Sequence, residues 1–154
     1  MSRLVINMGL PRTGTTSIGK AVRYLGFEYL NFERMVAHKQ PEAFNWELLP
    51  EEAFYILTMR ETPEIWFRSV IERSKVIKDN IHIKKQREKI YGFEMPDNHK
   101  KEFIEKYKDH NTRVVMKFYP LLVFITGKMG WIELCNYLNV KVPDIDYYHI
   151  NKQF

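Results

Sequence analysis

The 154-residue sequence is poor in cysteine and contains no long apolar run. Its one cysteine, Cys135, excludes an intramolecular disulfide, and its apolar setting after Trp131 predicts core packing over a reactive thiol. The longest apolar run, 121–125, is too short to cross a bilayer. The first residues lack the basic region and apolar stretch of a signal peptide. We therefore expect a cytoplasmic protein with no membrane partner.

The sequence also lacks a metal-binding pattern and a single basic block. No His/Cys spacing resembles a metal site, and His99 and His110 stand in a polar stretch that we expect to be exposed. The net charge of +5 favours anionic ligands only weakly, because Lys and Arg are interleaved with Asp and Glu. The basic residues of 84–89, Arg87 among them, are interpreted as a solvated face, since base-reading motifs are absent. We expect no nucleic-acid partner.

The composition is that of a folded globular chain. Hydrophobic residues make up 45% of the sequence and charged residues 28%, far from the profile of a disordered chain. The length predicts a single domain over residues 1–154. Nothing in the sequence specifies an oligomeric state.

Short β-branched apolar segments alternate with segments of helical spacing. Residues 4–8 are apolar, as in a strand buried on both faces, and from Thr16 the spacing becomes helical until Gly26. Residues 75–98 fit a mobile segment or a partly helical lid. The expected strands are 4–8, 28–30, 54–59 and 121–125, and the expected helices are 16–25, 33–39, from Pro63 past Ile71, from a cap at Asp97 or Asn98 to Pro120, and 130–138. This order predicts an α/β fold with a mostly parallel sheet.

A glycine-rich loop joins the first strand to the first helix. The order strand, loop, helix lets backbone N–H groups and the positive end of the helix converge on a phosphate. The Gly9-x4-Gly14 spacing matches the nucleotide P-loop, but Thr15 stands where that loop has its lysine, which argues against ordinary NTP hydrolysis. Arg12 supplies the positive charge instead, since a guanidinium contacts two anionic oxygens at once. The predicted anion-binding residues are Pro11, Arg12, Thr13, Gly14, Thr15, Thr16 and Ser17.

Three stretches resemble the PAPS-dependent sulfotransferases, where PAPS is 3′-phosphoadenosine 5′-phosphosulfate. Residues 11–17, Pro-Arg-Thr-Gly-Thr-Thr-Ser, resemble the 5′-phosphosulfate loop of that family. Residues 57–69 are similar to its second motif, a strand ending in arginine followed by a helix bearing serine, which bind the 3′-phosphate. This similarity implies that Arg60 and Ser69 bind there, with Arg68 or a neighbouring register as the alternative. Residues 130–138, with 142–144 and Asn151 after them, resemble the carboxyl end of one subfamily.

The resemblance implies a three-layer P-loop fold with a mostly parallel central sheet flanked by helices. It implies sulfuryl transfer from PAPS to a hydroxyl or amine, with 3′,5′-ADP as product and no metal required. Arg12 would stabilise the charge on the leaving oxygen. Glu33 and His38, which follow the second strand, are the candidate general bases, and an unidentified residue or none is the alternative. The acceptor stays open, because variable loops form its surface.

Two other functions compete with this interpretation. A P-loop nucleotide or small-molecule kinase would share the loop, but the absent lysine after Gly14 disfavours it. A non-catalytic module would bind 3′,5′-ADP or PAPS and lack an acceptor site, which is compatible with a chain shorter than most members of the family.

Overall fold

The computed structural model describes residues 3–124 and 130–147. Ile125, the expected end of the last strand, and Asn151 of the third stretch lie outside these residues.

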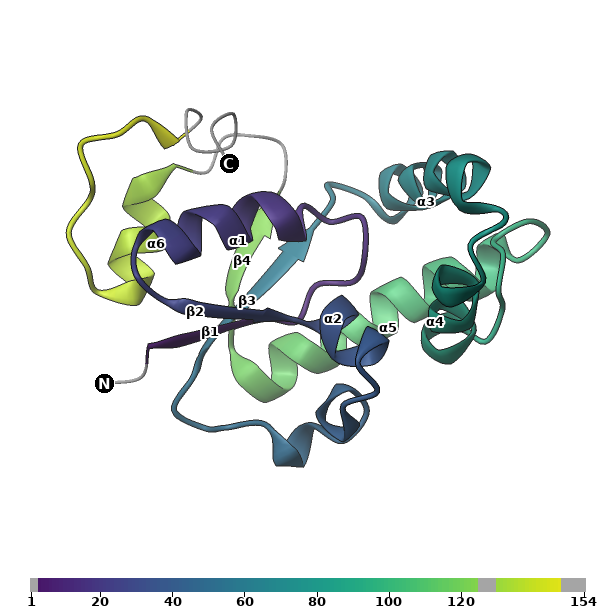
Figure 1. The fold of residues 1–154 in the computed structure, drawn as a ribbon, viewed down its shortest axis with the longest axis horizontal. Helices are drawn as coiled ribbons and strands as arrows, with labels where there is room; N and C mark the ends of the chain where they lie inside the picture. The colour runs from purple at the N-terminus through teal and green to yellow at the C-terminus, as the bar shows by residue number, and fades with distance from the viewer. Residues whose placement is uncertain (1–2, 125–129, 148–154) are drawn as a thin grey trace.

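The described residues form one parallel sheet (Figure 1). Its strands are β1 (Leu4–Asn7), β2 (Glu28–Asn31), β3 (Phe54–Met59) and β4 (Leu121–Phe124), in the order β2-β1-β3-β4. The chain moves from β1 to one side of the sheet for β2 and returns to the other side for β3. The loops after β1 and β3 therefore meet at the point where the strand order reverses, the usual ligand position in open parallel sheets.

Helices cover both faces of this sheet, which confirms the predicted α/β class (Figure 1). Val5 and Ile56 share one apolar cluster with α1 and α6, and Ile6 and Leu57 share the other with α2, α3, α4 and α5. The helices are α1 (Thr15–Tyr24), α2 (Phe32–Ala37), α3 (Pro63–Ile77), α4 (Ile81–Tyr91), α5 (Lys100–Phe118) and α6 (Trp131–Leu138), with two short 3₁₀ turns, Pro41–Ala43 and Trp46–Leu48. Trp66, Trp131 and Cys135 are buried, as predicted.

The region from 75 to 98 is more regular than the sequence suggested. Helix α3 continues to Ile77, and α4 begins after Asn80, whose side chain accepts hydrogen bonds from the N–H groups of His82 and Ile83, both at 3.1 Å. The prediction that Asp97 or Asn98 caps the next helix was wrong: His99 is the N-cap residue of α5.

Two expectations of exposure were also wrong. His110 is buried against Phe32, with Nε2 2.6 Å from the carbonyl oxygen of Met8. Arg87 is only 6% exposed, because α4 turns this side chain towards α3. None of the helices within 3–124 and 130–147 is long and apolar enough to cross a membrane.

Candidate functional site

The loop between β1 and α1 presents free backbone N–H groups. Gly14, the N-cap residue of α1, has φ of 85°, which glycine adopts without strain. The first helical bond runs from Ile18 N to Gly14 O at 3.3 Å. The N–H groups of Thr15, Thr16 and Ser17 therefore have no acceptor among the described residues, as is normal in a first helical turn. They are available to an anion.

A buried polar network holds this loop from below. Asn7 Oδ1, at the end of β1, accepts hydrogen bonds from Gly9 N at 2.8 Å and from Thr58 Oγ1 at 3.2 Å. The Thr58 hydroxyl lies 2.7 Å from Thr13 Oγ1, which donates to Leu10 O at 2.6 Å. Because these groups are buried, breaking any one bond leaves an unsatisfied polar atom. The network therefore fixes the loop against β3.

Tyr29 connects β2 to the first turn of α1. Its hydroxyl donates to Thr15 O at 2.7 Å and accepts from Asn7 Nδ2 at 3.0 Å. Burial raises the pKa of Tyr29, so this hydroxyl keeps its proton throughout the physiological range. The position of the first helical turn is thus tied to two neighbouring strands.

Two arginines converge above the loop. Arg60, just past β3, donates from Nε to Arg12 O at 2.9 Å and from Nη2 to Ser69 Oγ at 3.2 Å. Arg12 Nε donates to the same Ser69 oxygen at 3.3 Å, and Arg12 has a φ of 71°, unusual for a residue with a side chain. Burial and the neighbouring Arg12 lower the pKa of Arg60. Within the described residues neither arginine forms a salt bridge, although Glu33 interacts with Arg12 at longer range.

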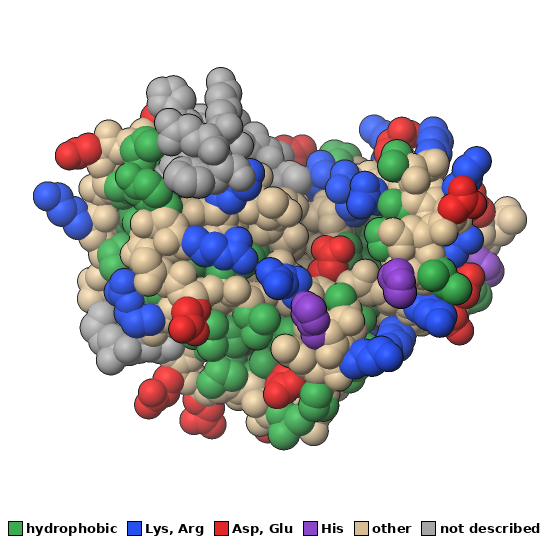
Figure 2. All heavy atoms as spheres, in the orientation of Figure 1, with side chains coloured by type: hydrophobic (Ala, Val, Ile, Leu, Met, Phe, Trp, Pro, Cys, Tyr) green, Lys and Arg blue, Asp and Glu red, His purple; other side chains and the backbone are tan. Residues whose placement is uncertain are grey.

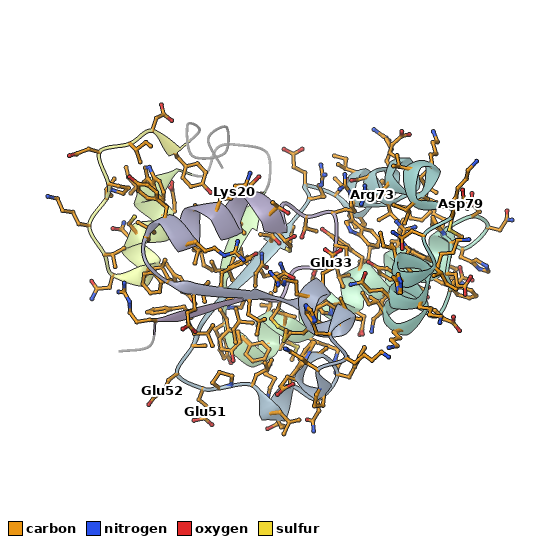
Figure 3. The ribbon with its side chains drawn as sticks, in the orientation of Figure 1. Lys20, Glu33, Glu51, Glu52, Arg73 and Asp79 are labelled. Atoms are coloured by element: carbon orange, nitrogen blue, oxygen red, sulfur yellow. The ribbon has the colours of Figure 1, made fainter. Side chains whose placement is uncertain are left out.

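A cavity of about 360 Å³ opens beside these arginines. It lies where α1, α2, α3 and α4 meet the loops after β1 and β3, and Glu33 and Arg73 lie near one another there (Figure 3). Its lining residues are Pro11, Arg12, Gly14, Thr15, Thr16, Ser17, Glu33, Arg60, Val70, Arg73, Ile83, Gln86, Arg87, Ile90 and Tyr91. Four arginines face one carboxylate, and the cavity is therefore suited to an anionic ligand.

Comparison with known families agrees with this geometry. A family model described as a sulfotransferase domain matches residues 4–54 and 46–153, which together span nearly the whole chain. The chain belongs to the sulfotransferase domain family. None of the curated proteins compared with it matches.

The sulfotransferase domain brings most of the predicted site residues together. The 11–17 loop and Arg60 line the cavity, except for Thr13, which is buried below the loop. Ser69 bonds both arginines, while Arg68 is exposed and makes none of these bonds.

The two candidate bases of the sulfotransferase domain have different surroundings. Glu33 lies in the first turn of α2 and lines the cavity. Burial raises the pKa of its carboxyl, and Arg12, Arg73 and Arg87 partly offset this effect. His38 is the exposed C-cap residue of α2 and is not among the lining residues.

Sequence reasoning placed Ser69 of α3 at the site but missed Arg73 on the same helix and all of the residues of α4. Arg73 comes from α3, and Gln86, Arg87 and Tyr91 come from α4. A signal was present, since positions 83, 87, 90 and 91 repeat at helical spacing. We grouped Arg87 with the solvated lysines because its charge interrupts the apolar pattern, and the helix face formed by these four positions was therefore not recognised.

Proposed function

We propose that this sulfotransferase domain takes PAPS as donor and binds its 5′-phosphosulfate on the 11–17 loop and its 3′-phosphate at Arg60 and Ser69. The observation that carries the proposal is the convergence of two guanidiniums on Ser69 Oγ without a carboxylate. Two like charges held together in a partly buried place are unfavourable until an anion joins them. A ligand with separate 5′ and 3′ anionic groups can place one anion on the 11–17 loop and the other at Arg60 and Ser69.

The free N–H groups of the first turn of α1 support the same donor. They lie at the positive end of the α1 dipole, and the hydroxyls of Thr16 and Ser17 are exposed beside them. The loop lysine of nucleotide hydrolases is replaced by Thr15, and Arg12 supplies a planar donor in its place. This arrangement suits a phosphosulfate better than the triphosphate of a kinase substrate.

The reaction assigned to the cavity is an in-line transfer. A lone pair of the acceptor oxygen or nitrogen forms a bond to sulfur while the bridging oxygen–sulfur bond breaks, and 3′,5′-ADP leaves with that electron pair. The acceptor proton passes to Glu33, which we propose as the general base because it lines the cavity. Arg12 and the N–H groups of α1 stabilise the charge developing on the leaving phosphate.

Calorimetric titration with 3′,5′-ADP tests the donor. We expect affinity in the micromolar range, lost in Arg12→Ala and kept in Arg68→Ala, which removes an exposed arginine outside the cavity. Preference for Mg·ATP, or binding of neither nucleotide, would overturn the proposal in favour of a kinase or an unrelated function. Binding without turnover on any acceptor would favour the non-catalytic module.

The base is tested by release of 3′,5′-ADP from PAPS in the presence of a panel of phenols, alcohols and amines. Glu33→Gln is expected to lower turnover by about 10²–10⁴ without weakening 3′,5′-ADP binding, because it removes a negative charge that interacts with Arg12. His38→Gln, on the exposed end of the same helix, is the matched control. Loss of turnover in His38→Gln alone would transfer the role to that residue.

A further inference from the structure

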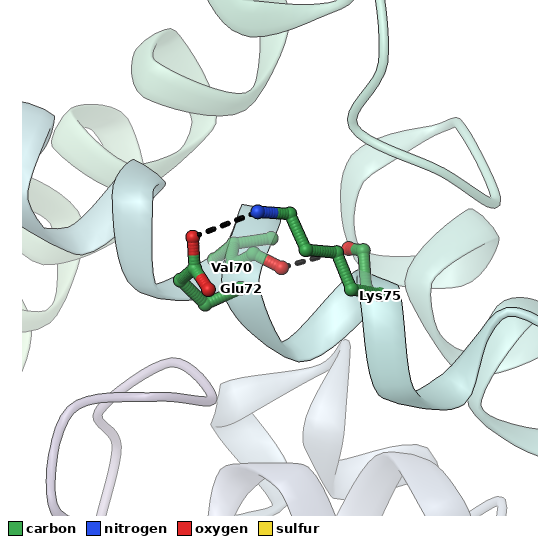
Figure 4. A network of polar contacts seen from close by, with 4 residues as sticks. Val70, Glu72 and Lys75 are labelled. Atoms are coloured by element: carbon green, nitrogen blue, oxygen red, sulfur yellow. Dashed lines mark hydrogen bonds and ion pairs between the residues drawn. The ribbon is translucent and has the colours of Figure 1, made fainter.

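Arg87 is a buried cation that no carboxylate of the described residues contacts directly. Its Nη1 donates to Ser74 Oγ on α3. Ser74 in turn donates to Val70 O at 2.7 Å, the bond drawn to Val70 in Figure 4. The ion pair drawn in the same view, Lys75 with Glu72, is exposed and does not involve Arg87. Within the described part of the chain Arg87 forms no salt bridge. One hydroxyl therefore satisfies a single donor of a guanidinium that has five.

A second unsatisfied group borders the same cavity. The Tyr91 hydroxyl, one turn further along α4, is buried and has no hydrogen-bond partner among the described residues. Tyr91 is 8% exposed, and both Tyr91 and Arg87 line the cavity. Arg87 can only donate hydrogen bonds and the Tyr91 hydroxyl can donate one, so a ligand with acceptor atoms can satisfy both, and an anionic oxygen also offsets the charge of Arg87.

The rest of this side of the cavity is apolar. Val70, Ile83 and Ile90 contribute apolar side chains to its lining. Glu33 is the one carboxylate in the described lining of the cavity, and it interacts with Arg12 and Arg73 as well as with Arg87. One carboxylate therefore cannot neutralise the lining, and burial accordingly lowers the pKa of Arg87. A charge left unpaired in such a place is unfavourable, and a bound anion offsets this cost.

The donor does not use these groups. Its phosphates are assigned to the loop, Arg60 and Ser69, on the side of the cavity formed by β1 and β3. Arg87 and Tyr91 come from α4, and Glu33 on α2 completes the lining with them. The α4 side is therefore available to the acceptor.

We infer that the acceptor carries an anionic group on an apolar body, with the anion bound by Arg87 and the Tyr91 hydroxyl and the reacting hydroxyl or amine directed to Glu33. The class is defined by the charged oxygens, whether carboxylate, phosphate or sulfate, together with an apolar part that contacts Val70, Ile83 and Ile90. This inference rests on the proposed sulfuryl transfer, because it assigns the acceptor half of the same cavity.

Benzoate and benzamide are the probes, because they differ in charge and hardly in shape. Their dissociation constants are measured by NMR titration at constant ionic strength with 3′,5′-ADP saturating. We expect benzoate to bind about tenfold more tightly than benzamide, as expected for one charge-assisted contact. Arg87→Met should abolish this preference, and Lys85→Met should keep it, since Lys85 is exposed on the same helix and outside the cavity. Equal affinities in the unsubstituted protein, or a preference that survives Arg87→Met, would overturn the inference.

Tyr91→Phe provides a second variant that preserves the packing of α4. It should weaken benzoate binding severalfold, and unchanged binding would count against the site even if Arg87→Met failed to fold. Binding of 3′,5′-ADP is measured first. Its absence would count against the proposed donor and not against the anion site, and the benzoate comparison would then be made on the free protein.

Discussion

At the scale of single residues, the close packing below the loop makes Gly9 irreplaceable. A Cβ on Gly9 would lie 2.1 Å from Thr58 Oγ1 and 2.8 Å from Thr58 O, so a side chain can enter only if β3 moves. Gly9→Ala is expected to lower the free energy of unfolding by about 3 kcal/mol and to weaken 3′,5′-ADP binding. Gly130→Ala is the control, because a Cβ there meets no described atom within 4 Å. Urea unfolding measures the free energy of unfolding of both variants. Equal stability of Gly9→Ala and Gly130→Ala would contradict the close contact between residue 9 and Thr58.

His110 makes stability depend on pH. Burial lowers its pKa to about 4 from 6.5, and nearby Lys106 and Arg113 act in the same direction. Between pH 6.5 and pH 4 the unfolded chain binds a proton at His110 that the folded protein does not bind. The stabilisation that is fully present above pH 6.5 is therefore lost as the pH falls towards 4. The loss is on the order of 3 kcal/mol.

The variant that isolates this effect is His110→Gln, whose amide can still donate to Met8 O. Its stability should fall less steeply than that of the unsubstituted protein over this pH range, as measured by urea unfolding at each pH. Parallel stability curves would show that His110 does not titrate as described.

The loop residues could be predicted from the sequence because their chemistry is local. Glycines at 9 and 14, Arg12 between them and hydroxyls after them are sufficient to indicate an anion site next to a buried strand. The exposure of His110 and Arg87 could not be predicted, because each is buried by tertiary contact with another helix, α2 for His110 and the preceding helix α3 for Arg87.

At the scale of elements, α4 shows where sequence reasoning fails. The segment from 81 to 91 is rich in Lys, Arg and Gln, and its buried face consists of Arg87, Ile90 and Tyr91. An apolar stripe interrupted by an arginine does not distinguish a packed helix from a solvated one. The strands were easier to predict, because the central strands β1 and β3 are short apolar runs buried on both faces, although the edge strands β2 and β4 are partly exposed.

The N-cap of α4 offers a test at this scale. Asn80 accepts two backbone N–H groups, and Asn80→Ala removes both bonds at a cost of about 1 kcal/mol. Hydrogen exchange of the α4 amides should accelerate, and benzoate binding should weaken with it, because Arg87 and Tyr91 depend on this helix. Asn80→Asp, which restores an acceptor at the helix start, is expected to recover the stability. Unchanged exchange in Asn80→Ala would mean that tertiary contacts alone fix α4.

At the scale of the whole molecule, the strand order assembles the site. The order β2-β1-β3-β4 places the ends of β1, β2 and β3 side by side, and these ends lead to Gly9, Glu33 and Arg60. The sequence indicates parallel strands but not their order, so the proximity of Glu33 to the arginines could not be deduced from motifs alone. On the face shown in Figure 2, Lys and Arg side chains are scattered and acidic side chains lie among them, so the net charge of +5 does not itself identify the site.

The salt dependence of 3′,5′-ADP binding distinguishes attraction by the cavity arginines from attraction by the net charge of the whole protein. Raising the salt concentration from about 0.1 M to about 1 M shortens the screening length to about 3 Å and is expected to weaken 3′,5′-ADP binding about tenfold, because several cations act on one anionic ligand. Adenosine, which has no charge, should bind weakly at both concentrations.

Lys85→Glu lowers the net charge by two at an exposed position outside the cavity. If the four arginines of the cavity determine affinity, this variant keeps the slope of affinity against salt. A slope that falls in proportion to net charge would instead assign the attraction to the whole surface.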